Sequence, residues 1–83
     1  VDFWPPWCGP CRMVSPVVDE VATDMADVIA VAKCNVDENE ELALKYGVMS
    51  IPTLIIFRDG AEVGRLVGAL PKEKLVEEIK RTI

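Results

Sequence analysis

The fold is decided by the stretch VDFWPPWCGPCRM, residues 1–13. It begins with apolar and aromatic residues that are typical of a buried strand, and two prolines then prevent this strand from continuing as a paired one. Cys8 and Cys11 follow at the start of a segment with helical periodicity. A thiolate in the first turn of a helix is stabilised by unpaired backbone N–H groups and by the helix dipole, which lower its pKa. The stretch therefore predicts a strand, a loop and a helix that together present a reactive thiol.

The spacing of Cys8 and Cys11 permits a reversible disulfide. We expect Cys8 to be the nucleophile, because it stands at the head of the helix. Cys11 lies one turn further in on the same side, where it can attack a mixed disulfide held on Cys8. The alternative is half of a zinc site, but the chain has no His and offers only Cys34 as a further soft ligand. Pro10 between the cysteines and the helix that follows favour redox use, so we expect no metal and a small buried side chain at Cys34.

The composition describes one small domain over residues 1–83, with 51% hydrophobic residues. The net charge of −5 and the scattered Lys and Arg residues disfavour a nucleic-acid partner. No apolar run approaches the roughly 20 residues that span a bilayer, so we expect a soluble protein without a membrane partner. Three cysteines fit a secreted disulfide framework poorly. They favour one redox pair and one spare thiol in a reducing compartment, and hence a cytoplasmic location.

Hydrophobic periodicity predicts the elements that follow the cysteines. A long helix runs from Cys8 to about Met25 and is kinked by Pro16. The other expected elements are a strand over Val28–Lys33, a helix over Glu40–Tyr46, strands over Thr53–Phe57 and Glu62–Val67, and a helix from Pro71. The last two strands flank residues 58–60 as a β-hairpin. A crossover helix requires parallel strands and a hairpin requires antiparallel ones, so we expect an α/β fold with a mixed four-stranded sheet and helices on both faces.

Asp2 is a charged residue within an apolar strand. Alternation along the strand places it on the opposite sheet face from Val1 and Phe3. It could be an edge-strand residue that faces solvent. Because both faces of this strand should be covered, we favour a buried carboxyl beneath the cysteines that exchanges a proton with Cys11. Lys33, near the end of a neighbouring strand, is placed to modulate this carboxyl.

Two further positions lie near the expected site. The sequence does not set the isomer of the Ile51-Pro52 bond, which precedes a strand, and trans is the common state of such bonds. Trp7 stands beside the nucleophile and after the prolines. We expect it to form a partly exposed contact surface, the alternative being that it packs against its own loop.

The stretch quoted above, together with KCNVDEN at 33–39, IPT at 51–53, DG at 59–60 and VGA at 67–69, resembles the thioredoxin family along nearly the whole chain. The resemblance implies a thioredoxin-like fold, in the order strand, helix, strand, helix, strand, strand, helix, that lacks the family's first strand and helix. It also implies that Cys8 attacks, Cys11 resolves, Asp2 is the buried acid and Lys33 its neighbour. The Ile51-Pro52 bond would be cis.

The resemblance further implies a function, that of a protein-disulfide reductase. Electrons would pass from a separate thioredoxin reductase through Cys8 and Cys11 to disulfide-containing protein substrates, and no bound cofactor would be needed. The backbone of the residue before the cis-proline would pair with an extended substrate segment. The implied docking surface comprises Trp7, Gly9, Pro10, Ile51, Pro52, Gly68 and Ala69. The alternative from another class is a non-catalytic protein-binding module that uses the same surface.

Two departures from the family pattern matter. The family usually has Ala where this chain has Pro5, and its first strand, first helix and the start of its central strand precede the point that corresponds to Val1. A chain that began at Val1 would leave the strand Val28–Lys33 with an unpaired edge, and only the helix Glu40–Tyr46 would cover one sheet face. For such a chain we expect marginal stability or self-association.

Overall fold

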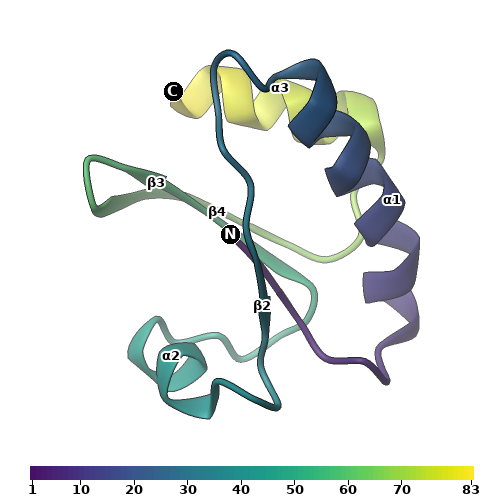
Figure 1. The fold of residues 1–83 in the computed structure, drawn as a ribbon, viewed down its shortest axis with the longest axis vertical. Coiled ribbons are helices and arrows are strands. Elements are labelled where there is room, and N and C mark those ends of the chain that lie inside the picture. Colours follow the sequence, from purple (N-terminus) through teal and green to yellow (C-terminus); the bar gives the residue numbers. More distant parts are fainter.

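The computed structural model describes residues 1–83. Its elements are β1 (Asp2–Trp4), α1 (Gly9–Asp24), β2 (Lys33–Asn35), α2 (Glu40–Lys45), β3 (Thr53–Arg58), β4 (Ala61–Val67) and α3 (Lys72–Thr82). The strands form one sheet in the order β2-β1-β3-β4 (Figure 1). β1 runs parallel to β2 and antiparallel to β3, and β3 pairs antiparallel with β4. The expected order of elements and the mixed four-stranded sheet are confirmed.

Alternating side chains along β3 separate two apolar layers. On one face, Leu54 belongs to a core built with α1 and α3. On the other face, Ile55 packs with Phe3 and Cys34, and Tyr46 at the end of α2 lies against them. In Figure 1, α1 and α3 accordingly lie together and α2 lies apart from them, beyond the sheet. Helices therefore cover both faces, as expected.

α1 is one continuous helix even though Pro16 lies inside it. Its residues Cys11, Val14, Val18 and Val21 are buried and recur at helical spacing, so they form a single face that packs on the sheet. This packing holds the helix together across a proline that removes one backbone N–H. None of the helices combines the length and the apolar character needed to cross a lipid bilayer.

One predicted strand is wrong in its position. The run Val28–Lys33 was expected to pair as a strand, but β2 covers only Lys33–Asn35. The N–H groups of Val28 and Ile29 instead donate to the carbonyl of Met25, at 2.9 and 2.8 Å, in a turn that ends α1. Residues 29–32 belong to no strand, although the Ala32 carbonyl accepts a hydrogen bond from the Asp2 N–H at 2.9 Å. The turn that ends α1 therefore takes up the first residues of the apolar run, and the strand begins only at Lys33.

Left-handed backbone closes the turn between β3 and β4. Asp59 has a φ of 53° and Gly60 a φ of 82°, the pair of positive values that a two-residue type I′ hairpin requires. The expected hairpin is confirmed.

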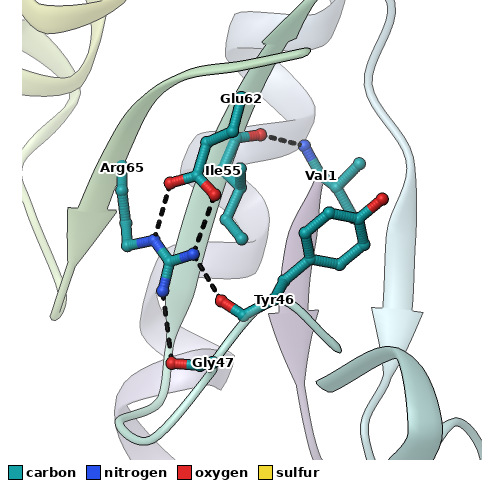
Figure 2. A network of polar contacts seen from close by, with 6 residues as sticks. All are labelled: Val1, Tyr46, Gly47, Ile55, Glu62 and Arg65. Atoms are coloured by element: carbon teal, nitrogen blue, oxygen red, sulfur yellow. Dashed lines mark hydrogen bonds and ion pairs between the residues drawn. The ribbon is translucent and has the colours of Figure 1, made fainter. Parts of the chain in front are cut away.

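Arg65 on β4 ties this edge strand to the end of α2. Its guanidinium donates to both carboxylate oxygens of Glu62 and to the backbone carbonyls of Tyr46 and Gly47 (Figure 2). The last carbonyls of a helix have no partners within the helix, so an arginine is well suited to satisfy them. The network fixes α2 relative to the sheet, and thereby fixes the loop that leads from α2 to β3.

Candidate active site

Cys8 and Cys11 form a disulfide at the start of α1, with their Cα atoms 5.2 Å apart. Cys8 is the N-cap residue in an extended conformation, and its Sγ accepts a hydrogen bond from the Cys11 N–H at 3.1 Å. The structure therefore represents the oxidised pair. A backbone donor and the N-terminus of α1 thus both face the Cys8 sulfur, and such surroundings favour the charged form of a thiol.

The loop before Cys8 is held by its own prolines. The Cys8 N–H donates to the Pro5 carbonyl at 3.3 Å, and Arg12 Nη2 donates to the Pro6 carbonyl at 3.0 Å. Pro5, the residue that departs from the family pattern, is buried and supplies the acceptor of the first of these bonds. The substitution is thus compatible with the geometry of the cysteine loop.

Asp2 is buried, with 2% of its surface exposed, and its Oδ1 has no hydrogen-bond partner. Burial raises the pKa of this carboxyl above its usual value of 3.8, because the charged form loses its hydration, and the nearby positive charges of Lys33 and the N-terminus offset only part of the rise. Asp2 is paired in register with Leu54, which packs against α1. The expected buried carboxyl therefore lies beneath the helix that carries Cys11.

Lys33 stands beside Asp2 in the parallel ladder between β1 and β2, but it makes no hydrogen bond to that residue. Its Nζ donates to Ser15 Oγ at 2.6 Å and lies 2.8 Å from Asp19 Oδ1, both on α1. Its charge acts on Asp2 only through space, where it lowers the pKa of the carboxyl. Lys33 thus also connects β2 to α1, a role that the sequence pattern did not indicate.

The Ile51-Pro52 peptide bond is cis, as the resemblance implies. Pro52 is buried, and its carbonyl accepts a hydrogen bond from the Gly68 N–H at 2.9 Å. Gly68 has a φ of 95°, a conformation that favours glycine. This bond brings the loop before β3 together with the Gly68-Ala69 segment after β4.

Trp7 is 69% exposed, and Gly9 and Pro10 beside it are exposed as well. The indole Nε1 of Trp7 donates to Asp37 Oδ2 at 3.0 Å, which fixes the ring against the loop after β2. Trp7 and Ile51 line the same surface groove, so the cysteine loop and the cis-proline loop are neighbours. The sequence analysis did not identify Asp37 as the partner of Trp7. Its position just after the carboxyl end of β2, the strand beside β1, could have indicated an acceptor near the cysteine loop.

No group of three or more His, Cys, Asp or Glu side chains is placed to hold a metal ion. Cys34 is buried and unpaired, and it packs with Phe3 and Ile55 on the sheet face opposite α1. It therefore lies apart from the disulfide pair.

A disulfide at the start of a helix, on a mixed sheet and beside a cis-proline loop, defines a class of proteins, the thiol–disulfide oxidoreductases with a thioredoxin-like fold. The comparison with family models then identifies the family, because the model described as Thioredoxin matches residues 1–81. The chain belongs to the thioredoxin family.

Curated relatives agree over nearly the whole chain. Thioredoxin 1 of Synechococcus elongatus is 56% identical over 98% of this chain and 76% of its own length. The thioredoxin of Bacillus subtilis is 52% identical over 96% of this chain and 77% of its own length, and that of Rhodospirillum rubrum is 51% identical over 100% and 80%. The protein is a thiol–disulfide oxidoreductase that reduces disulfides in protein substrates, through the pair Cys8 and Cys11.

Proposed function

We propose that Cys8 is the attacking thiol and Cys11 the resolving thiol of this reductase. The Cys8 thiolate attacks one sulfur of a substrate disulfide, and the other sulfur leaves as a thiolate that takes up a proton. Deprotonated Cys11 then attacks the Cys8 sulfur of the mixed disulfide and releases the second substrate thiol. Two electrons have passed to the substrate, and a Cys8–Cys11 disulfide remains.

The observation that carries this assignment is the hydrogen bond from the Cys11 N–H to Cys8 Sγ at the N-cap of α1. A backbone donor and the positive end of a helix dipole both favour the charged form of the sulfur they face. Cys11 donates this bond from within the first turn, and its own sulfur receives no such contact among the hydrogen bonds of the structure. The asymmetry supports Cys8 as the residue that is a thiolate at neutral pH.

Asp2 is proposed to take the proton of Cys11 before the resolving attack and to return it when the pair is reduced. Its burial beneath α1, its free Oδ1 and a pKa that burial raises suit a carboxyl that holds and exchanges a proton more readily than an exposed one does. Lys33 is proposed to modulate this carboxyl through space, while its hydrogen bonds go to α1.

Substrates are proposed to dock as an extended segment whose backbone pairs with Ile51, on the surface around the disulfide. The docking residues are Trp7, Gly9, Pro10, Ile51, Pro52, Gly68 and Ala69. Support comes from the exposure of Trp7 and Ala69 and from the hydrogen bond that joins Gly68 to Pro52.

A separate thioredoxin reductase is proposed to return two electrons and two protons to the disulfide, so that residues 1–83 act as one domain without a bound cofactor. We place this cycle in the cytoplasm. Three cysteines, of which one pair is redox-active and Cys34 is unpaired, fit a secreted disulfide framework poorly and support a reducing compartment.

Insulin reduction in the presence of dithiothreitol tests the roles of the two thiols. A Cys34→Ala background leaves only the pair to react. We expect Cys8→Ser to abolish activity, and Cys11→Ser to abolish turnover while it accumulates a mixed disulfide on Cys8 that mass spectrometry detects. An equally fast adduct on Cys11 in the Cys8→Ser variant would reverse the assignment. Full activity of both variants would favour the non-catalytic binding module instead.

A further inference from the structure

Residues 49–51, which precede the cis-proline, make few hydrogen bonds of their own. None of their backbone N–H groups donates a hydrogen bond, and only the carbonyl of Ser50 accepts one, from Thr53 Oγ1. Both backbone groups of Ile51, at which substrates are proposed to pair, are therefore free. The position of Ile51 depends on how the chain is anchored on either side of this segment.

The sheet anchors the chain after this segment. The Pro52 carbonyl accepts a hydrogen bond from the Gly68 N–H at 2.9 Å, and Thr53, with 1% of its surface exposed, begins β3. Thr53 is paired in the sheet with both Phe3 and Val67. The downstream end is thus fixed by three neighbouring strands.

The chain before this segment is anchored less firmly. α2 has six residues, none of which is buried. Its end is closed by a Schellman motif, in which the Gly47 N–H donates to the Leu44 carbonyl and the Val48 N–H to the Ala43 carbonyl, at 3.1 and 2.8 Å. Apolar contacts of Tyr46 and Val48 hold this end against the sheet. Such contacts are non-directional, so they do not by themselves fix the orientation of the backbone.

Arg65 supplies a directional link between the sheet and the end of α2 (Figure 2). It is paired with Ile55 in the ladder, and its side chain lies on the sheet face that α2 covers. Nη1 donates to the Gly47 carbonyl at 3.2 Å and Nη2 donates to the Tyr46 carbonyl, and no other side chain donates to these two carbonyls. The Glu62 carboxylate holds the guanidinium through Nε at 3.0 Å and through Nη2 at 2.9 Å.

We propose that Arg65 is a positioning residue for protein substrates, because it fixes the two carbonyls that lead into the segment carrying Ile51. Glu62 orients the guanidinium, whose planar fork reaches one carboxylate and two carbonyls at once, a geometry that a lysine ammonium does not match. Arg65 acts only through the backbone of residues 46–51 and contacts no substrate itself. This inference rests on the proposed docking of substrates at Ile51. It adds a residue that controls the binding of a polypeptide without changing the reactivity of the thiols.

Two disulfides separate positioning from thiol chemistry. Insulin offers a polypeptide backbone that can pair with Ile51, whereas bis(2-hydroxyethyl) disulfide offers none. The second-order rate constant of the fully reduced protein is measured with each, and their ratio cancels any change in thiol reactivity. We expect Arg65→Met to lower the ratio of insulin to small disulfide by about tenfold, since a small misplacement of a binding group costs much of the rate. Arg58→Met makes the same change of charge on β3 and should keep the wild-type ratio.

Two milder variants keep the test valid if Arg65→Met does not fold. Arg65→Lys retains the charge and loses the fork, so it should recover only part of the ratio. Glu62→Gln leaves Arg65 in place but weakens the group that orients it, and should lower the ratio by less than Arg65→Met does.

Amide hydrogen exchange measures the anchoring directly. In the Arg65 variants the N–H groups of Gly47 and Val48 should exchange several times faster than in Arg58→Met. The N–H groups of Val18 and Val21 in α1 should keep their wild-type rates, because only the end of α2 is released. Equal acceleration in α1 would mean a general loss of stability and would overturn the positioning role.

Failure of this inference is distinguishable from failure of the proposed function. If the wild-type protein reduces both disulfides and the Arg65 variants keep its ratio, the positioning role is refuted and the reductase assignment stands. The same holds if Arg65→Met and Arg58→Met lower the ratio equally. If the wild-type protein reduces the small disulfide but not insulin, the docking proposal fails and takes this inference with it. If it reduces neither, the proposed function itself fails.

Discussion

At the scale of single residues, Asp2 combines an environment that is unfavourable for a carboxyl with the proton-exchange role proposed for it. A buried carboxyl with a free oxygen is unfavourable, yet it lies beneath α1, where Cys11 must lose a proton before it attacks. We expect Asp2→Asn to slow insulin reduction at neutral pH by roughly 10- to 100-fold. This effect is smaller than is usual for a positioned acid–base group, because water can take over part of the proton transfer. The pH profile of the resolving step should lose the ionisation of Asp2. An unchanged rate and profile would exclude a role in proton transfer.

The same carboxyl predicts a pH dependence of stability. Its pKa is raised in the folded state by burial, whereas in the unfolded chain it titrates near 3.8. Between these two values the folded state binds more protons than the unfolded state, so the free energy of unfolding contributed by Asp2 falls as the pH rises and is constant above the folded pKa. The difference between wild type and Asp2→Asn, measured by urea unfolding across this range, should follow that fall. A difference that does not vary with pH would contradict the raised pKa.

Single residues also mark the limit of prediction from sequence. The burial of Asp2 followed from strand alternation and covered sheet faces. The contacts of Lys33 with Ser15 and Asp19 could not be foreseen, because they depend on how α1 lies across β2. The cis state of Ile51-Pro52 was reached only through the family resemblance, since the local sequence favours no isomer strongly.

At the scale of elements, the hairpin between β3 and β4 depends on backbone that only glycine adopts at little cost. A Cβ at Gly60 would meet no atom within 4 Å, so any cost of Gly60→Ala arises from its φ of +82° alone. We expect a loss of about 1–2 kcal/mol in the free energy of unfolding, measured by chemical denaturation. Gly9 is the matched control, because it has equal space and no positive φ. Gly9→Ala should leave stability unchanged or raise it by up to about 1 kcal/mol, and equal effects at both positions would refute the explanation.

Elements were predictable where local chemistry and packing agree. The spacing of Val14, Val18 and Val21 identified α1, and the Asp59-Gly60 pair identified the hairpin, because the same residues satisfy both requirements. The segment before Lys33 was wrongly predicted to be a strand, because its apolar residues do not share one structural environment. Val28 is in the turn that ends α1 and is exposed, whereas Ile29 packs against the core without belonging to a strand. An apolar run alone does not show whether a partner strand is present.

At the scale of the whole molecule, β1 pairs with only the first part of β3. The rest of that edge of β3 is a slot that an additional strand residue could fill. Val1 and Ile55 exchange both backbone hydrogen bonds, at 2.7 and 2.9 Å, and Figure 2 shows the one that the Val1 nitrogen donates. Such pairs recur at every second residue of an antiparallel ladder, so Phe57 is the next residue of β3 whose backbone groups face this edge. An apolar hollow of about 620 Å³ lies there, between β3 and the segment that leads to β2. Within residues 1–83, no strand pairs with this part of β3, so we expect a further strand residue placed there to add stability.

Adding three apolar β-branched residues before Val1 should fill this slot. They would pair with Phe57, and alternation would direct the residue next to Val1 to the same face as Asp2, into the hollow that Val18 and Leu54 line. Against a Ser-Gly-Ser extension of equal length, we expect the free energy of unfolding to rise by about 2 kcal/mol or more, because apolar side chains leave water. If two copies associate through this edge, the melting temperature rises with protein concentration, and the extension should weaken that rise because it occupies the edge. Equal melting behaviour of the two extended chains would show that the hollow does not accept a strand and that covering this edge of β3 adds no stability.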